Sequence, residues 1–337
     1  SGGLADVAGS LPHTLCRKGQ DCRIVMPLYG TIPQELKNQM NFITNFTVPV
    51  SWRHQYCGLF WARWNDCTYY FIDNLFYFGG EKPYGDIRGD VEKFTFFSKA
   101  VLSVLKTIDF RPDLIHCHDW QTGFIPVYLK NQFADDPYFH NIKTVFTIHN
   151  LKFQGVWNIE TIRGLSGLSD YYFAPDKLEY KKDANMLKGG LTYSDYITTV
   201  SETYANEIQT EEYGEGMEGL LQSRHFDMMG IVNGIDTVVY DPETDKAIFE
   251  NYSANAPENK AVNKAKLQEY LGLPVKEDTA LIGIVSRLVG HKGFDLVKCV
   301  FEELLQNDVQ FTILGSGEWE FEDFFSQMAA KYPDKVG

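Results

Sequence analysis

Short apolar segments alternate with helical stretches along most of this 337-residue chain. Segments that are apolar nearly end to end are typical of parallel strands covered on both faces. The expected strands are residues 23–26, 113–117, 144–148, 196–200, 230–232, 281–285 and 310–314. The expected helices are residues 91–108, 123–132, 202–209, 259–271, 294–305 and 319–331. This order predicts an α/β protein with doubly wound parallel sheets.

Two stretches depart from this alternation. Aromatic residues alternate with polar ones over residues 41–80, which predicts antiparallel strands or hairpins. Residues 240–259 are rich in Asp, Pro, Asn and Ala and have no apolar period, so we expect a domain boundary there. The predicted domains are residues 1–240 and 241–337. The apolar stripe from Leu4 to Leu15 also predicts an N-terminal helix, kinked at Pro12.

Charge and composition limit the possible partners. Lys plus Arg number 31 against 45 for Asp plus Glu, a net charge of −14, and no basic run is present. Nucleic acids and anionic membranes need a basic face, so neither is expected as a partner. No apolar run approaches the roughly 20 residues that span a bilayer. Six scattered cysteines without a C-x-x-C pair predict reduced thiols, hence a cytoplasmic protein, or a stromal one in a plant or alga.

Polar side chains follow two of the expected strands. His118, Asp119 and Trp120 lie in the loop that ends the first, and His149 and Asn150 follow the second. Ligands of open α/β sheets bind beyond the carboxyl ends of the strands, and burying such polar groups without partners is costly. These residues therefore predict a binding site. For Trp120 two roles stay open, stacking on a sugar ring or packing in the core.

A metal site is not expected in this chain. His116 and His118 share one face of a strand, but an H-x-H pair without a third ligand is more often structural. No D-x-D sequence is present to hold Mg²⁺ against a diphosphate. The motifs of serine hydrolases, P-loop NTPases and zinc proteases are also absent.

The segment after the expected strand 281–285 suits a diphosphate. Arg287 and Lys292 lie five residues apart in a strongly acidic chain, and a glycine-started helix follows them. The planar guanidinium of Arg can donate two parallel hydrogen bonds to a phosphate, and the ammonium of Lys supplies a single positive charge. The alternative is a pair of solvated surface cations. Ser286 precedes Arg287, and Gly315 begins a second anion-friendly loop in the same domain.

Two weaker signals complete the list of candidate sites. Gly2 and Gly3 open a helix, where backbone N–H groups can approach an anion, although a plain loop is the simpler interpretation. Asn233 lies in a tight turn just before the expected domain boundary. Its position, more than its residue type, makes it a candidate.

Seven segments in collinear order resemble the glycogen and starch synthases: residues 1–12, 118–123, 146–155, 188–201, 208–210, 233–236 and 286–293. The resemblance implies the GT-B fold, in which two Rossmann-like doubly wound domains face each other across a cleft. Residues 1–240 would then form the acceptor-side domain, and residues 241–337 an incomplete nucleotide-sugar domain. It also implies transfer of glucose from ADP-glucose to the non-reducing end of an α-1,4-glucan, with retention of configuration and no metal or cofactor.

The resemblance assigns roles residue by residue. Catalytic roles fall on His149, Asp119, Arg287 and Lys292, the last two neutralising the departing diphosphate. Substrate-binding roles fall on Gly2, Gly3, Asp6, Tyr84, Trp120, Asn150, Asn233, Ser286 and Gly315. Of these, Gly2 and Gly3 match the glycines that pack against the donor's phosphates, and Asp6 matches an aspartate close to that loop. Tyr84 matches an aromatic near the donor.

The sequence also departs from the family pattern. The family has a lysine just before the two glycines and a glutamate-bearing motif that would follow Gly337, so we expect that both ends are cut. Residues 289–291, which end in His291, stand where the family more often has a polar segment that ends in Gln. Two alternatives stay open: a truncated, non-catalytic glucan-binding protein, and a retaining GT-B transferase that uses another nucleotide sugar.

Overall fold

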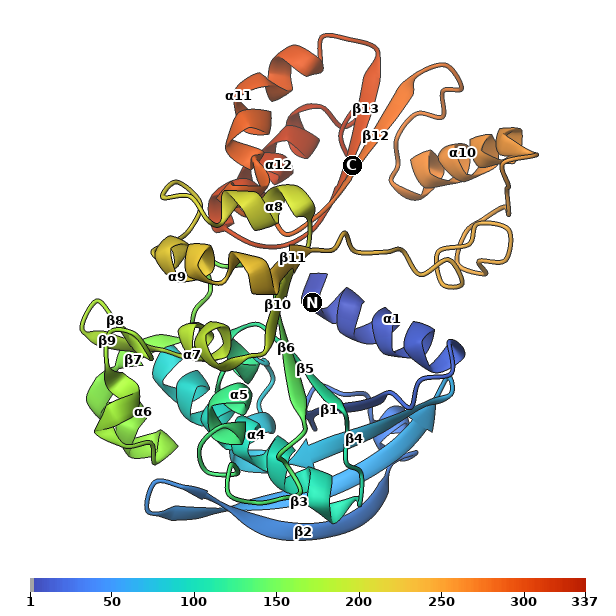
Figure 1. The fold of residues 1–337 in the computed structure, drawn as a ribbon. Helices are drawn as coiled ribbons and strands as arrows, with labels where there is room; N and C mark the ends of the chain where they lie inside the picture. Colours follow the sequence, from blue (N-terminus) through green and yellow to red (C-terminus); the bar gives the residue numbers. More distant parts are fainter. Residues whose placement is uncertain (1–2) are drawn as a thin grey trace. The chain divides into compact units, whose positions relative to one another are not determined.

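The computed structural model describes residues 3–337 (Figure 1). The chain divides into two compact units, Ser1–Gly234 and Ile235–Gly337, and each has its own apolar core. Both units combine helices with parallel strands, so the predicted α/β class is confirmed. Five short 3₁₀ turns complete the two units: η1 (Trp120–Thr122), η2 (Asp170–Phe173), η3 (His225–Asp227), η4 (Pro257–Asn259) and η5 (Gly290–Lys292).

The first sheet of the larger unit has four strands in the order β1-β4-β3-β2. Its strands are β1 (Arg23–Pro27), β2 (Asn41–Val50), β3 (Arg53–Trp64) and β4 (Cys67–Asp73). β2, β3 and β4 pair antiparallel, as expected for residues 41–80, and β1 joins β4 in parallel. Asn65 and Asp66 turn the chain between β3 and β4 with φ of 46° and 67°, the left-handed values that a tight hairpin needs.

Four helices accompany this sheet: α1 (Gly3–Arg17), α2 (Gln34–Lys37), α3 (Leu75–Phe78) and α4 (Ile87–Thr107). α4 is buried along most of its length, including Phe94 and Phe96, and forms the centre of the core. Asp86 caps its first turn by accepting a hydrogen bond from the Gly89 amide. α1 is the expected N-terminal helix, and it continues through Pro12.

The second sheet of this unit is fully parallel, in the order β11-β10-β6-β5. Its strands are β5 (Leu114–His118), β6 (Lys143–Ile148), β10 (Tyr196–Thr199) and β11 (Met228–Gly230). The helices that follow them are α5 (Phe124–Leu129), α7 (Met186–Tyr193), α8 (Glu202–Glu207) and α9 (Glu218–Ser223). The Ser201 side chain accepts a hydrogen bond from the Tyr204 amide and begins α8. Because the strands are parallel, their carboxyl ends lie at one edge of the sheet.

Two details of this region differ from the sequence expectation. The last strand was expected at residues 230–232 but is β11, which begins at Met228 and pairs with β10. Residues 156–185 also fold into a three-stranded antiparallel sheet, in the order β7-β9-β8. Its elements are β7 (Val156–Asn158), α6 (Ile159–Ser166), β8 (Glu179–Tyr180) and β9 (Asp183–Asn185), and the three strands are too short to show the alternation that would predict them.

The smaller unit has a two-stranded parallel sheet, β12 (Ala280–Val285) with β13 (Val309–Leu314). Its helices are α10 (Lys260–Tyr270), α11 (Phe294–Leu304) and α12 (Trp319–Lys331). Phe301 of α11 is fully buried and contacts the rings of Phe311 and Phe325. All five elements agree closely with the ranges expected from the sequence.

Candidate active site

The tips of β5 and β6 are joined through Asp119. Its backbone N–H donates to the Thr147 carbonyl at 3.0 Å, and its Oδ1 accepts from the His149 backbone N–H at 2.8 Å. Asp119 has φ 55° and ψ −177°. A non-glycine residue in this region costs about 1–3 kcal/mol, and such strain gathers at functional sites. The sheet edge is therefore held in a strained but defined geometry.

Three histidines lie side by side at this edge. The Nδ1 of His118 is 3.0 Å from the Nε2 of His149, and the ring centroids of His116 and His118 are 4.1 Å apart. The Nε2 of His116 lies 2.6 Å from the Thr147 hydroxyl, which lies 2.6 Å from the hydroxyl of Thr198. The Nδ1 of His149 is buried and has no hydrogen-bond partner in the structure. A buried ring nitrogen requires a hydrogen-bond partner, and this one has none within the protein.

Burial sets the charges of these groups. It raises the pKa of Asp119 to about 6, although hydrogen bonds from the backbone amides of His149 and Asn150 oppose the rise. It lowers the pKa of His116 to about 4, and it also lowers the pKa values of His118 and His149. At neutral pH the site therefore holds one carboxylate beside three neutral imidazoles.

Tyr84 is held close to the same edge by a buried ion pair on α4. Lys93 and Asp90 are 2.7 Å apart, and both are nearly inaccessible to solvent. Asp90 accepts from the Gly85 amide through both carboxylate oxygens, and Lys93 donates to the carbonyl of Pro83. The pair thus fixes the residues on either side of Tyr84. The Tyr84 hydroxyl in turn accepts a hydrogen bond of 3.2 Å from Gln121, two residues beyond Asp119.

In the smaller unit, the predicted anion-binding residues surround the end of β12. The Ser286 amide donates to the Leu314 carbonyl of β13, which brings the loops after both strands together. A Cβ on Gly315 would lie 1.9 Å from the Ser286 carbonyl oxygen, so only glycine fits there. Arg287 and Lys292 are exposed, and within the described part of the chain neither forms an ion pair. Their charges are available to a ligand.

Comparison with known proteins now places these residues in a family. Residues 1–223 match the family model of the starch synthase catalytic domain. The chain is 51% identical over 337 residues to the glycogen synthase of Lachnospira eligens, covering 100% of this chain and 70% of that protein. It is 49% identical over 337 residues to that of Geobacillus stearothermophilus, covering 100% and 69%. The chain belongs to the starch and glycogen synthase family. Its members are glycosyltransferases.

A solved structure agrees with the family assignment. The catalytic domain of starch synthase IV from Arabidopsis thaliana, bound to ADP and acarbose, matches with a TM-score of 0.92 and 29% sequence identity. The match covers 100% of this chain and 70% of that one. It confirms the GT-B type of fold that the sequence resemblance implies for this synthase.

Trp120 lies in the core of the synthase. Its side chain is 6% exposed and packs edge to face on Phe94, with ring centroids 5.2 Å apart. A Cβ on Gly155 would approach the Trp120 ring to 2.2 Å, so the backbone of Gly155 covers the indole closely. Of the two roles left open by the sequence, the structure favours packing.

The remaining predicted residues of the larger unit are placed less tightly. Asn150 is half-buried, and its side chain accepts from the Lys152 amide, which shapes the loop after β6. Asn233 is exposed beyond β11. Asp6 is exposed in the first turn of α1, and Gly3 is the first residue of that helix. Gly2 lies outside the described residues.

Sequence reasoning did not identify every residue that shapes the site. The sequence places His118 at a strand tip and suggests a metal or a structural role for the His116–His118 pair, and it gives no signal for Lys93 or Asp90. The signal that pointed to the histidines was their spacing of two on one face of a strand. Across residues 3–337 no group of three or more His, Cys, Asp or Glu side chains is arranged to hold a metal ion. None of the helices described is long and apolar enough to span a membrane.

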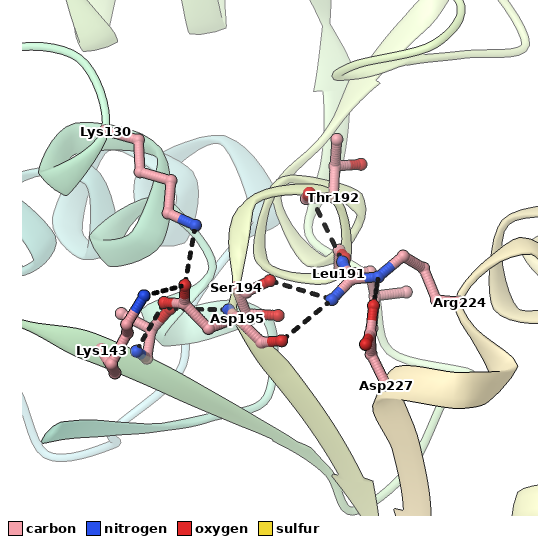
Figure 2. Close-up of polar contacts among 9 residues, drawn as sticks. Lys130, Lys143, Leu191, Thr192, Ser194, Asp195, Arg224 and Asp227 are labelled. Atoms are coloured by element: carbon pink, nitrogen blue, oxygen red, sulfur yellow. Dashed lines mark hydrogen bonds and ion pairs between the residues drawn. The ribbon is translucent and has the colours of Figure 1, made fainter.

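A second polar cluster of the synthase lies at the opposite, amino-terminal ends of β6 and β10 (Figure 2). Asp195 accepts hydrogen bonds from the Thr144 amide and hydroxyl at 2.9 and 3.0 Å, and Lys130 and Lys143 lie 3.3 and 3.5 Å from it. Arg224 donates to backbone carbonyls at the end of α7, including those of Leu191 and Ser194. Each of these charged side chains is paired with another group of the protein, so we interpret the cluster as structural.

Proposed function

We propose that this synthase transfers glucose from ADP-glucose to the non-reducing end of an α-1,4-glucan with retention of anomeric configuration. The observation that carries the proposal is the match of the whole chain, at 51% identity, to a glycogen synthase. The Arabidopsis relative binds ADP and acarbose, which supports an adenine nucleotide as the leaving group and a glucan as the acceptor.

Arg287 and Lys292 stabilise the departing diphosphate in this proposal. Cleavage of the glycosidic bond places negative charge on the ADP and positive charge on the sugar ring. Preorganised cations lower the cost of that charge separation, typically by about 3–4 kcal/mol for a single donor. Both side chains are exposed and free of ion pairs in the smaller unit, and Ser286 and Gly315 flank them at the end of the sheet. No metal ion is needed for this step.

His149 and Asp119 serve the glucose side of the reaction. The Nδ1 of His149 is buried and unpartnered, so a sugar hydroxyl that binds it gains a full hydrogen bond. Asp119 uses its carboxylate to hold the backbone of His149 and Asn150. We therefore propose that Asp119 holds the loop after β6 in its conformation and places a negative charge near the sugar. Tyr84 is assigned to the donor side and Asn233 to the connection between the units.

The test is incorporation of radiolabelled glucose from ADP-glucose into glycogen by the purified protein, with and without EDTA. We expect activity that survives EDTA and that falls by about 100-fold or more in His149→Ala, because a hydrogen-bonding partner of the sugar is lost. His140→Ala is the matched control, since His140 is exposed outside the site. Strong preference for UDP-glucose would establish the other-donor alternative, and glycogen binding without turnover would establish the non-catalytic one.

We also propose a cytoplasmic location and small-molecule and glucan partners only. All six cysteines are free thiols, which suits a reducing compartment. The net charge of −14 disfavours nucleic-acid and anionic-membrane partners. Fractionation of the producing cells, with the protein followed by antibody, tests the location.

A further inference from the structure

The ring contact between His118 and His149 couples the protonation of the two residues. Burial disfavours the imidazolium form of both, so each ring carries one N–H and one lone pair. The Nδ1 of His118 and the Nε2 of His149 are 3.0 Å apart. At this distance one nitrogen has to donate and the other has to accept, because two N–H groups or two lone pairs would repel each other. The tautomer of one ring therefore fixes that of the other.

Contacts with His116, and through it with the neighbouring strands, hold His118 in place. Its ring packs on that of His116 with centroids 4.1 Å apart. The His116 Nε2 is bound to the Thr147 hydroxyl, and that hydroxyl to Thr198 of the adjacent strand. All these residues belong to β5, β6 and β10, whose backbones are locked by parallel pairing. Rigid strands thus fix the orientation of His118.

The contact determines which atom of His149 is left for a ligand. Because His118 occupies the Nε2 of His149, only the Nδ1 remains, and this is the buried atom that has no partner. A buried polar atom without a partner, close to the strained residue Asp119, is typical of a site that a ligand completes. Without the contact, the ring could flip or change tautomer and present a different hydrogen-bonding atom.

We propose that His118 is a positioning residue that fixes the ring orientation and the tautomer of His149, so that Nδ1 of His149 meets a hydroxyl of the transferred glucose in one defined protonation state. This inference rests on the proposed function for its ligand. Its structural part, a single tautomer of His149 enforced by His118, applies to the protein without any substrate.

The kinetic test compares His118→Leu with His118→Asn. Leucine removes the polar contact, whereas an asparagine amide branches at the same position as the imidazole and supplies a polar atom near that of Nδ1. We expect His118→Leu to lower kcat about 100-fold while KM for ADP-glucose changes less than about threefold, because a misplaced catalytic group affects the chemical step. His118→Asn should recover at least about tenfold of the loss, and His140→Leu should match the wild type. Wild-type kcat in His118→Leu, or equal losses in both variants, would overturn the proposal.

The spectroscopic test needs no substrate. In protein labelled with ¹⁵N-histidine, long-range ¹H–¹⁵N spectra distinguish a protonated ring nitrogen from a bare one, and the His149 signals are those missing from His149→Gln. We expect one protonated and one bare nitrogen in the wild type, and averaged shifts in His118→Leu. An averaged His149 in the wild type, or an unchanged one in His118→Leu, refutes the positioning role. If glucose transfer itself fails, these spectra still decide the tautomer, so the two failures are distinguishable.

Discussion

Asp119 Oδ1 accepts a hydrogen bond of 2.8 Å from the backbone nitrogen of His149, and this contact joins the tips of two neighbouring parallel strands. The carboxylate is buried, and its residue sits at a positive φ of 55°. The synthase thus places a costly charge and a strained backbone at the point where the sugar is expected to bind. The buried charge and the strained backbone should each lower the free energy of unfolding, which can be measured.

The charge of Asp119 should destabilise the folded state increasingly as the pH rises from about 4 to about 6. Burial raises its pKa from 3.8 to about 6, so between these values the folded state binds more protons than the unfolded state, and stability falls as pH rises. A difference of this size corresponds to about 3 kcal/mol at most. The free energy of unfolding of Asp119→Asn minus that of the wild type should therefore increase by about 2–3 kcal/mol between pH 4 and pH 7, because only the wild type loses stability over this range. Urea denaturation at the two pH values measures it.

Asp195→Asn is the control, because its effect on stability should change with pH in the opposite direction. Burial disfavours its charge, but hydrogen bonds from Thr144 and the charge of Lys130 outweigh burial and hold the pKa of Asp195 below its ordinary value. Its contribution is present above the unfolded pKa and is lost as pH falls. The variant should therefore lose stability at pH 7 and recover relative to wild type toward pH 4. A parallel pH dependence of the two variants would contradict the assignment of charge at Asp119.

Removing either cation at the end of β12 should slow catalysis. We expect Arg287→Ala and Lys292→Ala each to lower kcat by about 100- to 1000-fold, because each loses one preorganised donor to the leaving diphosphate. Steady-state assays with ADP-glucose and glycogen measure the effect. Lys298→Ala, which removes a partly exposed lysine paired with Glu320 in the same unit, should keep kcat near wild type. Near-wild-type rates in the first two variants would refute the diphosphate assignment.

The parallel strands and most long helices were predictable because they depend on local pattern. β12 is an apolar run from end to end, β6 centres on Val145 and Phe146, and the range predicted for α12 is the observed Trp319–Lys331. The small sheet of β7, β8 and β9 was not predictable. Its strands have two or three residues each, and they form because tertiary contacts, such as the Asn185 side chain with Gln154, hold them.

The site was predictable only in part, for a related reason. Asp119 and His149 could be found because both directly follow apolar strands, which places them at one edge of a parallel sheet. The contact of His118 with His149 depends on the register of β5 against β6, and a single sequence does not contain that information. Likewise, Trp120 follows a strand like a ligand-binding residue, yet its ring turns into the core against Phe94.

Gly155 should not tolerate a side chain. It has φ 63°, and a Cβ there would meet the Trp120 ring at 2.2 Å. We expect Gly155→Ala to reduce the free energy of unfolding by about 2–3 kcal/mol through overpacking and backbone strain. Gly164→Ala is the matched control: Gly164 lies in α6 with open space around its Cβ, and alanine should stabilise that helix by up to about 1 kcal/mol. Thermal unfolding that moves in the same direction for both variants would contradict this account.

Arg224 should contribute stability without affecting catalysis. Its side chain is 17% exposed and donates to the Leu191 and Ser194 carbonyls at the end of α7 (Figure 2). These carbonyls precede the amino-terminal end of β10, whereas Asp119 and His149 follow the carboxyl ends of β5 and β6. Hydrogen bonds from a charged donor are worth about 1.5–3 kcal/mol, and removing this donor leaves those carbonyls unpaired.

Chemical denaturation of Arg224→Ala should therefore show a loss of about 2–3 kcal/mol, while kcat stays near wild type at a temperature where the variant is folded. The comparison is Arg163→Ala, which removes an ion pair with Asp170 whose side chains are 45% and 83% exposed. Exposed pairs of this kind contribute about 0–1 kcal/mol. Equal losses in the two variants would mean that the carbonyl contacts of Arg224 add nothing beyond a surface charge, and a large fall in kcat would place the arginine in the catalytic machinery instead.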